Sequence, residues 1–145
     1  MSKPNHSLLS LMPALLLAAC AGGPAPGGSS LEGPGPQLVV ERFLEAANAN
    51  DWQVMAQLFG TPDQTIGERD GAMRADRHMQ LLASLLRHDD YVVRGREQVP
   101  GHRDATNVVV EIVRDGTGVS IPFMVVRRND GGWIVQQIHR LEDLT

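Results

Sequence analysis

The strongest constraint on the fold is a change of hydrophobic periodicity close to residue 90. Beyond it, four runs rich in β-branched and aromatic residues are separated by short turn signals. Connections this short join antiparallel neighbours, so we expect a four-stranded meander. The turn signals are Pro100-Gly101, Asp115-Gly116-Thr117-Gly118 and Asn129-Asp130-Gly131-Gly132. The expected strands cover residues 91–99, 105–115, 119–128 and 133–141. Pro122 lacks an N–H donor, which predicts an edge position or a bulge for the third strand.

Before residue 90 the apolar residues recur at helical spacing in three segments. The first segment follows Pro36, which suits the first turn of a helix, and Asn50 can end it. Asp51 can cap a second helix that stops at Gly60, and a third helix lies within residues 70–88. The expected buried positions are Val39, Val40, Phe43, Leu44, Ala47, Trp52, Met55, Leu58, Phe59, Met79, Leu82, Leu85 and Leu86. The pattern predicts an α+β domain with about three N-terminal helices on one face of a curved four-stranded antiparallel sheet.

Two segments carry a resemblance to a known family. "VVERFLEAANANDWQVMAQLF" joins two helices through an "A.a.nDw..m..lF" pattern, and "RRNDGGWIVQQIH" places a turn and a tryptophan before alternating polar residues. Both resemble nuclear-transport-factor-2-like domains, over most of residues 37–141. The resemblance implies a conical α+β fold. The cone is expected to be reduced here, because the family's usual strand pair would fall in the short polar segment "TPDQTIGERDGA". Cystatin-like and other small helix-on-sheet modules remain open.

The beginning of the chain has the layout of an export signal. Lys3 precedes an apolar stretch over residues 8–19, which is too short to span a bilayer because a spanning helix needs about 20 residues. Leu17-Ala18-Ala19-Cys20 then resembles the lipobox of bacterial lipoproteins. The resemblance implies cleavage between Ala19 and Cys20. It also implies a diacylglycerol thioether on Cys20, commonly with an N-acyl chain such as palmitate.

The residues after Cys20 agree with that interpretation. "GGPAPGGSSLEGPGP" offers almost no side chain to a core and is typical of a flexible linker. We expect a signal peptide over residues 1–19, the lipidated cysteine and linker over residues 20–36, and the α+β domain over residues 37–145. Ala21 is not the aspartate that favours inner-membrane retention, which implies a periplasm-facing outer-membrane protein in a double-membrane host. A secreted protein cut elsewhere and an uncut N-terminal anchor remain the alternatives.

Composition narrows the possible partners. The formal net charge of −4 argues against a nucleic-acid binder, which normally carries a surplus of cations. A single cysteine excludes an internal disulfide and a multi-cysteine metal site. We therefore expect no metal and no cofactor apart from the covalent lipid. The expected partners are the membrane, through the anchor, and an envelope protein or a small apolar ligand; the oligomeric state stays open.

Few residues suggest catalysis. If Trp133, Val135, Gln137 and His139 share the concave face of the last strand, His139 lies near the cone mouth, where Arg127 could join it. Glu111 is the first choice for a carboxylate base, and Asp70 and Asp76 are further candidates. The alternative interpretation is a half-exposed strand end with solvated polar side chains.

"RHDD" after the third helix concentrates titratable groups. His88, Asp89 and Asp90 could recruit a metal, but His78 lies too far along the helix to share the ion. A helix C-terminus favours cations in any case, so capping and turn formation are the simpler interpretation. His102 is expected on a surface loop.

Taken together, these patterns predict a membrane-anchored envelope lipoprotein whose small domain is a non-enzymatic binding module. The alternative is an enzyme or ligand receptor of the ketosteroid-isomerase or polyketide-cyclase type, which would use the cone pocket.

Overall fold

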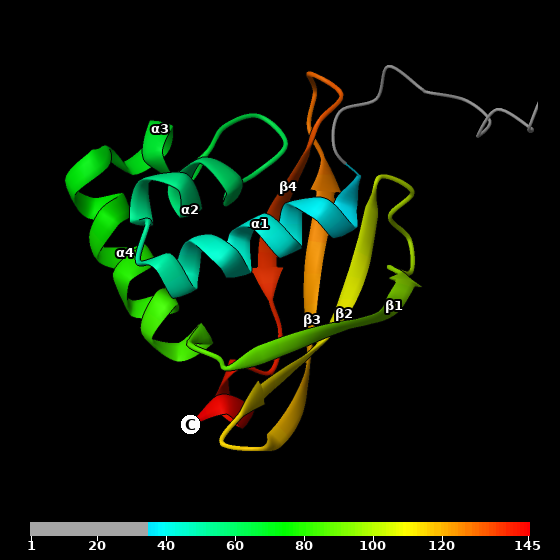
Figure 1. Ribbon diagram of the computed structural model, residues 1–145. Helices are drawn as coiled ribbons and strands as arrows, with labels where there is room; N and C mark the ends of the chain where they lie inside the picture. Colours follow the sequence, from blue (N-terminus) through cyan, green and yellow to red (C-terminus); the bar gives the residue numbers. More distant parts are fainter. Residues whose placement is uncertain (1–34) are drawn as a thin grey trace, which may run out of the picture.

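The computed structural model describes residues 35–145, and these form an α+β domain with helices α1 to α4, a four-stranded antiparallel sheet and a C-terminal 3-10 turn (Figure 1). The expected fold class is confirmed at this level. The signal segment, Cys20 and the linker before residue 35 lie outside the described residues. Pro36 is buried as the first residue of α1, so the folded part begins one residue earlier than expected.

The first helix begins and ends at the residues that local rules indicate, and the second begins there but ends at Leu58, two residues before Gly60. α1 (Pro36–Ala49) starts with its proline, and Asn50 closes it in the left-handed conformation with φ of 55°. α2 (Trp52–Leu58) is capped by Asp51, whose Oδ1 accepts a hydrogen bond from the Val54 amide at 3.1 Å. The two helices are therefore joined by a residue pair that ends one and caps the other.

The segment after α2 was expected to hold any remnant of a strand pair, and the structure differs there. It forms a short helix, α3 (Ile66–Asp70), which leads into α4 (Ala72–Leu86). Phe59 makes a single parallel bridge to Val135, so the chain touches the sheet edge without forming a strand. A Cβ on Gly60 would press on backbone atoms of the returning loop, which explains the glycine at this position.

The sheet is a meander in the order β1-β2-β3-β4. The strands are β1 (Asp90–Gln98), β2 (Ala105–Arg114), β3 (Thr117–Arg127) and β4 (Trp133–Ile138). β2 and β3 are joined by Asp115 and Gly116, which have φ of 50° and 75°. Positive φ at both central residues is the signature of a type I′ hairpin turn, which follows the natural twist of the strands.

Pro122 lies in β3, an interior strand, and pairs with Val109 without a register shift. The expectation of an edge position or a bulge is therefore wrong. Pairs in an antiparallel ladder alternate between hydrogen-bonded and non-hydrogen-bonded ones. Counting from the two-residue turn, Pro122 and Val109 form a non-hydrogen-bonded pair, so the backbone groups of residue 122 face β4 and not β2. There the Pro122 carbonyl accepts from the His139 amide at 2.9 Å, but Pro122 cannot donate in return. This one-sided pairing explains why β4 ends at Ile138.

The helices pack against one face of the sheet, with α1 crossing it and α2 and α4 alongside (Figure 1). Large apolar side chains fill the space between the two layers. Phe43 from α1, Met55 from α2, Met79 from α4 and Phe123 from β3 are all 0% exposed. Burying such side chains is the main source of stability in a domain of this size.

One end of the sheet is tied to the helices by polar contacts, and we call it the clamped end. Arg114, at the β2–β3 turn, donates hydrogen bonds of 2.5–2.9 Å to the carbonyls of Leu85, Arg87 and Leu144. The side chain of Asn48 bonds both backbone groups of His88, at 3.0 and 3.2 Å. These contacts satisfy carbonyls that the end of α4 leaves without intrahelical partners.

Candidate functional site

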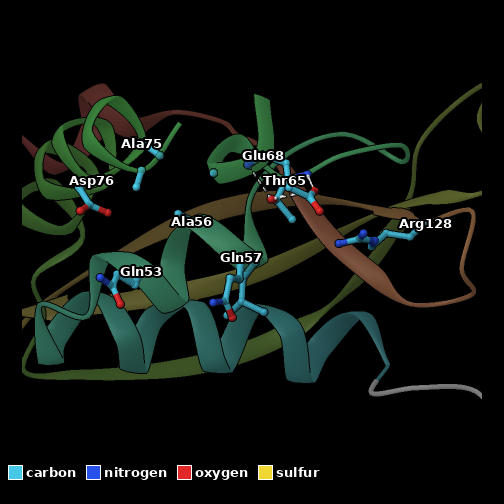
Figure 2. A pocket seen from close by; sticks show the side chains of 11 residues that line it. Gln53, Ala56, Gln57, Thr65, Glu68, Ala75, Asp76 and Arg128 are labelled. Atoms are coloured by element: carbon cyan, nitrogen blue, oxygen red, sulfur yellow. Dashed lines mark hydrogen bonds between the residues drawn. The ribbon is translucent and has the colours of Figure 1, made fainter. Parts of the chain in front are cut away.

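An open groove of about 650 Å³ lies between α2, α3 and α4 (Figure 2). Small and apolar side chains line much of it, and polar groups stand at its rim. The lining residues are Gln53, Ala56, Gln57, Leu58, Thr65, Gly67, Glu68, Ala72, Ala75, Asp76 and Arg128. The sequence analysis did not identify this groove as a site.

The wall formed by α3 is held by a capping box. Thr65 Oγ1 accepts from the Glu68 amide at 3.2 Å, and Glu68 Oε2 accepts from the Thr65 amide at 2.7 Å. The hydrogen bonds from the backbone and hydroxyl of Thr65 lower the pKa of Glu68, so it carries a negative charge near neutral pH. α3 packs beside α2 at Gly67, where a Cβ would lie at an ordinary contact distance of 3.9 Å from that of Ala56.

The polar groups of the groove come from three elements. Gln53 and Gln57 are exposed on α2, on the same side as the groove floor. Asp76 from α4 and Arg128 from the turn after β3 stand at opposite ends (Figure 2). Arg128 Nε lies 3.2 Å from Asp130 Oδ2, so its charge is partly compensated. The groove thus combines side-chain amides with a carboxylate at one end and, at the other, a guanidinium beside the carboxylates of Glu68 and Asp130.

This arrangement suits binding better than acid–base chemistry. Its most constrained carboxylate, Glu68, accepts hydrogen bonds from Thr65 and is stabilised as an anion, which makes it a weak base. In the part of the chain that the structure describes, no group of three or more His, Cys, Asp and Glu side chains could hold a metal ion.

The three candidate catalytic residues do not share a site. Glu111 faces away from the helices, opposite Ser120, and accepts from Arg94 Nε at 2.7 Å. Arg127 lies at the far end of β3 with its Cζ 5.8 Å from the Trp133 ring centroid. Seven residues separate positions 120 and 127 of this strand, or roughly 23 Å of extended chain.

His139 follows β4 and lies beside Pro122, away from Arg127. The expected alternation along β4 is also wrong. Val135 and Gln137 pair with the adjacent residues Val125 and Met124, because an irregularity inserts Gln136 between them. Val135 and Gln137 therefore lie on opposite faces of the sheet, so the assumption that brought His139 to the concave face does not hold.

The remaining titratable candidates are engaged in local contacts. Asp70 accepts two hydrogen bonds from Arg69, at 2.7 and 3.1 Å, and these lower its pKa. His88 is buried, with its Nδ1 2.8 Å from the Leu86 carbonyl. Asp89 and Asp90 accept backbone amides of residues 115 and 91. The "RHDD" residues therefore connect the end of α4 to β1 and to the β2–β3 turn, and His102 is exposed as expected.

One sequence signal could have located part of the groove. The motif Thr65-Ile66-Gly67-Glu68 is a capping box, with a threonine three residues before a glutamate. It marks the start of α3, in the short polar segment where the family's usual strand pair would fall. No sequence rule places Arg128 beside it, because that contact spans α3 and the β3–β4 turn.

Comparison with known proteins adds no assignment. No protein-family model matches the chain, and no curated protein matches it significantly. Among the described residues, no helix is long and apolar enough to cross a membrane.

Proposed function

We propose that this chain is a bacterial envelope lipoprotein whose small domain binds a protein partner and does not catalyse a reaction. Cleavage before Cys20 leaves a cysteine that carries a diacylglycerol and an N-acyl chain, and two or three chains anchor a protein stably. In a double-membrane host the protein resides at the outer membrane and faces the periplasm. The domain is a reduced nuclear-transport-factor-2-like cone, in which α3 takes the place of a strand pair.

The observation that carries the non-enzymatic role is the filling of the cone. A pocket enzyme of this architecture needs space between the helices and the sheet, but Phe43, Met55 and Phe123 occupy that space with no exposed surface. The catalytic alternative also needs an acid and a donor within hydrogen-bond reach. Glu111, Arg127 and His139 come from three separate regions of the sheet.

We assign partner binding to the groove between α2, α3 and α4, and its occupant to an extended segment of an envelope protein. The amides of Gln53 and Gln57 each offer a donor and an acceptor, which match the N–H and C=O of a peptide backbone. The floor of small side chains admits a backbone closely. Asp76 stands at one end, and at the other end Arg128 lies beside the carboxylates of Glu68 and Asp130, so the groove offers charges of both signs, which complement a mixed-charge peptide better than a polymer of one sign.

The anchor is tested by Cys20→Ser, followed by membrane fractionation and intact-mass analysis. We expect the unchanged chain in the membrane fraction with the mass of the acyl chains added, and the variant without that mass. Ser29→Ala in the linker is the matched control and should keep the lipid. An unchanged chain that is soluble and unacylated contradicts the lipoprotein assignment.

The groove is tested by photo-crosslinking from position 57 in isolated envelopes, with position 80 on the exposed side of α4 as the control. We expect an adduct from position 57 that Ala72→Trp abolishes by filling the groove. Met73→Trp, outside the groove, should leave that adduct unchanged. Crosslinking that is insensitive to Ala72→Trp contradicts the groove assignment. A small molecule that stays bound in native mass spectrometry would show that the groove binds an apolar ligand and not a peptide.

A further inference from the structure

A second hollow, of about 570 Å³, lies at the end of the sheet where α1 begins. We call this the open end, and it is opposite the clamped end along β2. Its walls come from Pro36, from Arg96 on β1, from Arg103 on the β1–β2 loop, from Thr106 and from Trp133. Neither the groove between α2 and α4 nor the candidate catalytic residues account for it.

The cations of this hollow differ from most others in the domain. Arg96 and Arg103 are exposed, and within residues 35–145 neither side chain makes a hydrogen bond or an ion pair. Arg96 pairs in register with the core residue Val108, so it projects from the helix side of the sheet. Glu97 is the one acid in the lining, and the register places it on the opposite face.

Trp133 gives the hollow an amphipathic wall. The ring is half-buried against the core, and the Cζ of Arg127 lies 5.8 Å from its centroid. Leu38, on the exposed side of α1 near its start, is 40% exposed. Tryptophan and arginine are residue types that lie at membrane interfaces, where one side is apolar and the other wet.

The position of the hollow relative to the chain indicates which surface it meets. α1 begins at the end of the sheet that holds the β1–β2 and β3–β4 turns (Figure 1), and its first residue, Pro36, lines the hollow. In the proposed lipoprotein, the open end is therefore the end of the domain to which the anchored segment is joined. An anionic leaflet attracts cations only within about a Debye length, so unpaired arginines act best at this end.

We propose that the open end binds phosphate groups of anionic phospholipids in the membrane that holds the lipid of Cys20. This inference rests on the lipoprotein assignment for its membrane. Two unpaired guanidinium groups offer planar hydrogen-bond donors that match phosphate oxygens, and Trp133 provides the apolar contact. The domain then docks on the bilayer through Arg96 and Arg103, which leaves the groove between α2 and α4 available to a partner.

The test uses the chain from Cys20 to Thr145 with Cys20→Ser, which includes every residue that the structure describes and carries no acyl chain. Its sedimentation is measured with vesicles of phosphatidylcholine alone and of phosphatidylcholine with phosphatidylglycerol. We expect binding only to the anionic vesicles, and a loss of affinity of about fivefold for each of Arg96→Gln and Arg103→Gln. The double variant Arg74→Gln with Arg77→Gln, on α4, makes the same change in charge as Arg96→Gln and Arg103→Gln combined, and should have no effect.

The other outcomes are equally informative. If Arg74→Gln with Arg77→Gln lowers the affinity for anionic vesicles, the proposal is overturned, and α4 is the membrane-binding surface. Met73 and Leu81 on that helix are 85% and 64% exposed. Binding of inorganic phosphate at Arg96 and Arg103 without vesicle binding overturns the lipid as the source of the phosphate. The chain used in the sedimentation test cannot be acylated, so its binding to vesicles does not depend on a lipid at Cys20. An absence of vesicle binding therefore contradicts only the phosphate site, and the mass and fractionation test of Cys20→Ser decides the lipoprotein assignment.

Discussion

The two ends of the sheet use arginine in opposite ways. At the clamped end, the Arg114 guanidinium donates to three backbone carbonyls and ties α4 and the C-terminal turn to β2. At the open end, Arg96 and Arg103 have no such partners within the described residues. The comparison shows that the acceptors around a side chain, and not the residue type, decide whether an arginine stabilises the fold or is available to a ligand.

Arg114→Met should break the clamped end and give the largest effect. Methionine keeps an apolar stem but removes every donor, so three carbonyls lose their protein partner. Because the site is partly exposed and water can replace some of the bonds, we expect a loss of about 2–4 kcal/mol in the free energy of unfolding. Urea denaturation measures it, and an unchanged midpoint would show that the clamp does not contribute to stability.

Asn48→Ala tests the second contact of the clamped end. It removes the two hydrogen bonds to the backbone of His88, and we expect a loss of about 1–2 kcal/mol by the same measurement. Gln37→Ala is the matched control, because its amide at the other end of α1 bonds only the exposed Glu41. The control should cost less than about 0.5 kcal/mol; equal losses would remove the distinction between the two ends.

The groove wall should contribute to stability in a pH-dependent way, whereas the arginine contacts of the clamped end should not. The pKa of Glu68 is lowered by its bonds to Thr65, so its contribution to stability is present above its unfolded pKa of about 4.5 and is lost as the pH falls through the folded value. Glu68→Gln should lower stability at pH 7 and flatten the fall of stability as the pH drops below about 4.5. Arg114→Met should lower stability by a similar amount at each pH in that range. Thermal unfolding across the pH series checks both. A pH profile of Glu68→Gln parallel to that of the unchanged chain would contradict this role.

Arg96→Gln and Arg103→Gln should have the smallest effect on folding. Since neither side chain has a partner in the described fold, we expect changes within about 0.5 kcal/mol in urea. These variants distinguish the arginines of the open end from Arg114, because they are expected to change vesicle binding without changing stability. A clear destabilisation would place Arg96 and Arg103 in the same structural class as Arg114.

Much of the fold could be predicted from local patterns. The caps at Asn50 and Asp51, the turn at Asp115-Gly116 and the four strands all depend on residues close together in the sequence. Pro122 and the alternation along β4 could not be predicted in this way. Both depend on the pairing between β3 and β4, and a single extra residue at Gln136 reverses the face of the residues that follow it.

The candidate site shows the same division. The capping box of α3 was present in the sequence from Thr65 to Glu68, but the groove exists only because α2, α4 and Arg128 surround that helix. The catalytic candidates Glu111, Arg127 and His139 were chosen by residue type. Only the register shows that they are directed to different regions.

By itself, the sequence determined the α+β class, the positions of α1, α2, α4 and the four strands, and the lipobox that supports the proposed anchor, because these follow from spacing and chemistry within short segments. The tertiary structure decided which polar side chains have partners. Arg114 finds carbonyls from α4 and the C-terminus, whereas Arg96 and Arg103 surround a hollow beside α1. That difference depends on contacts between distant segments, and hydrogen-bond acceptors supplied by a folded backbone have no local signature in the sequence.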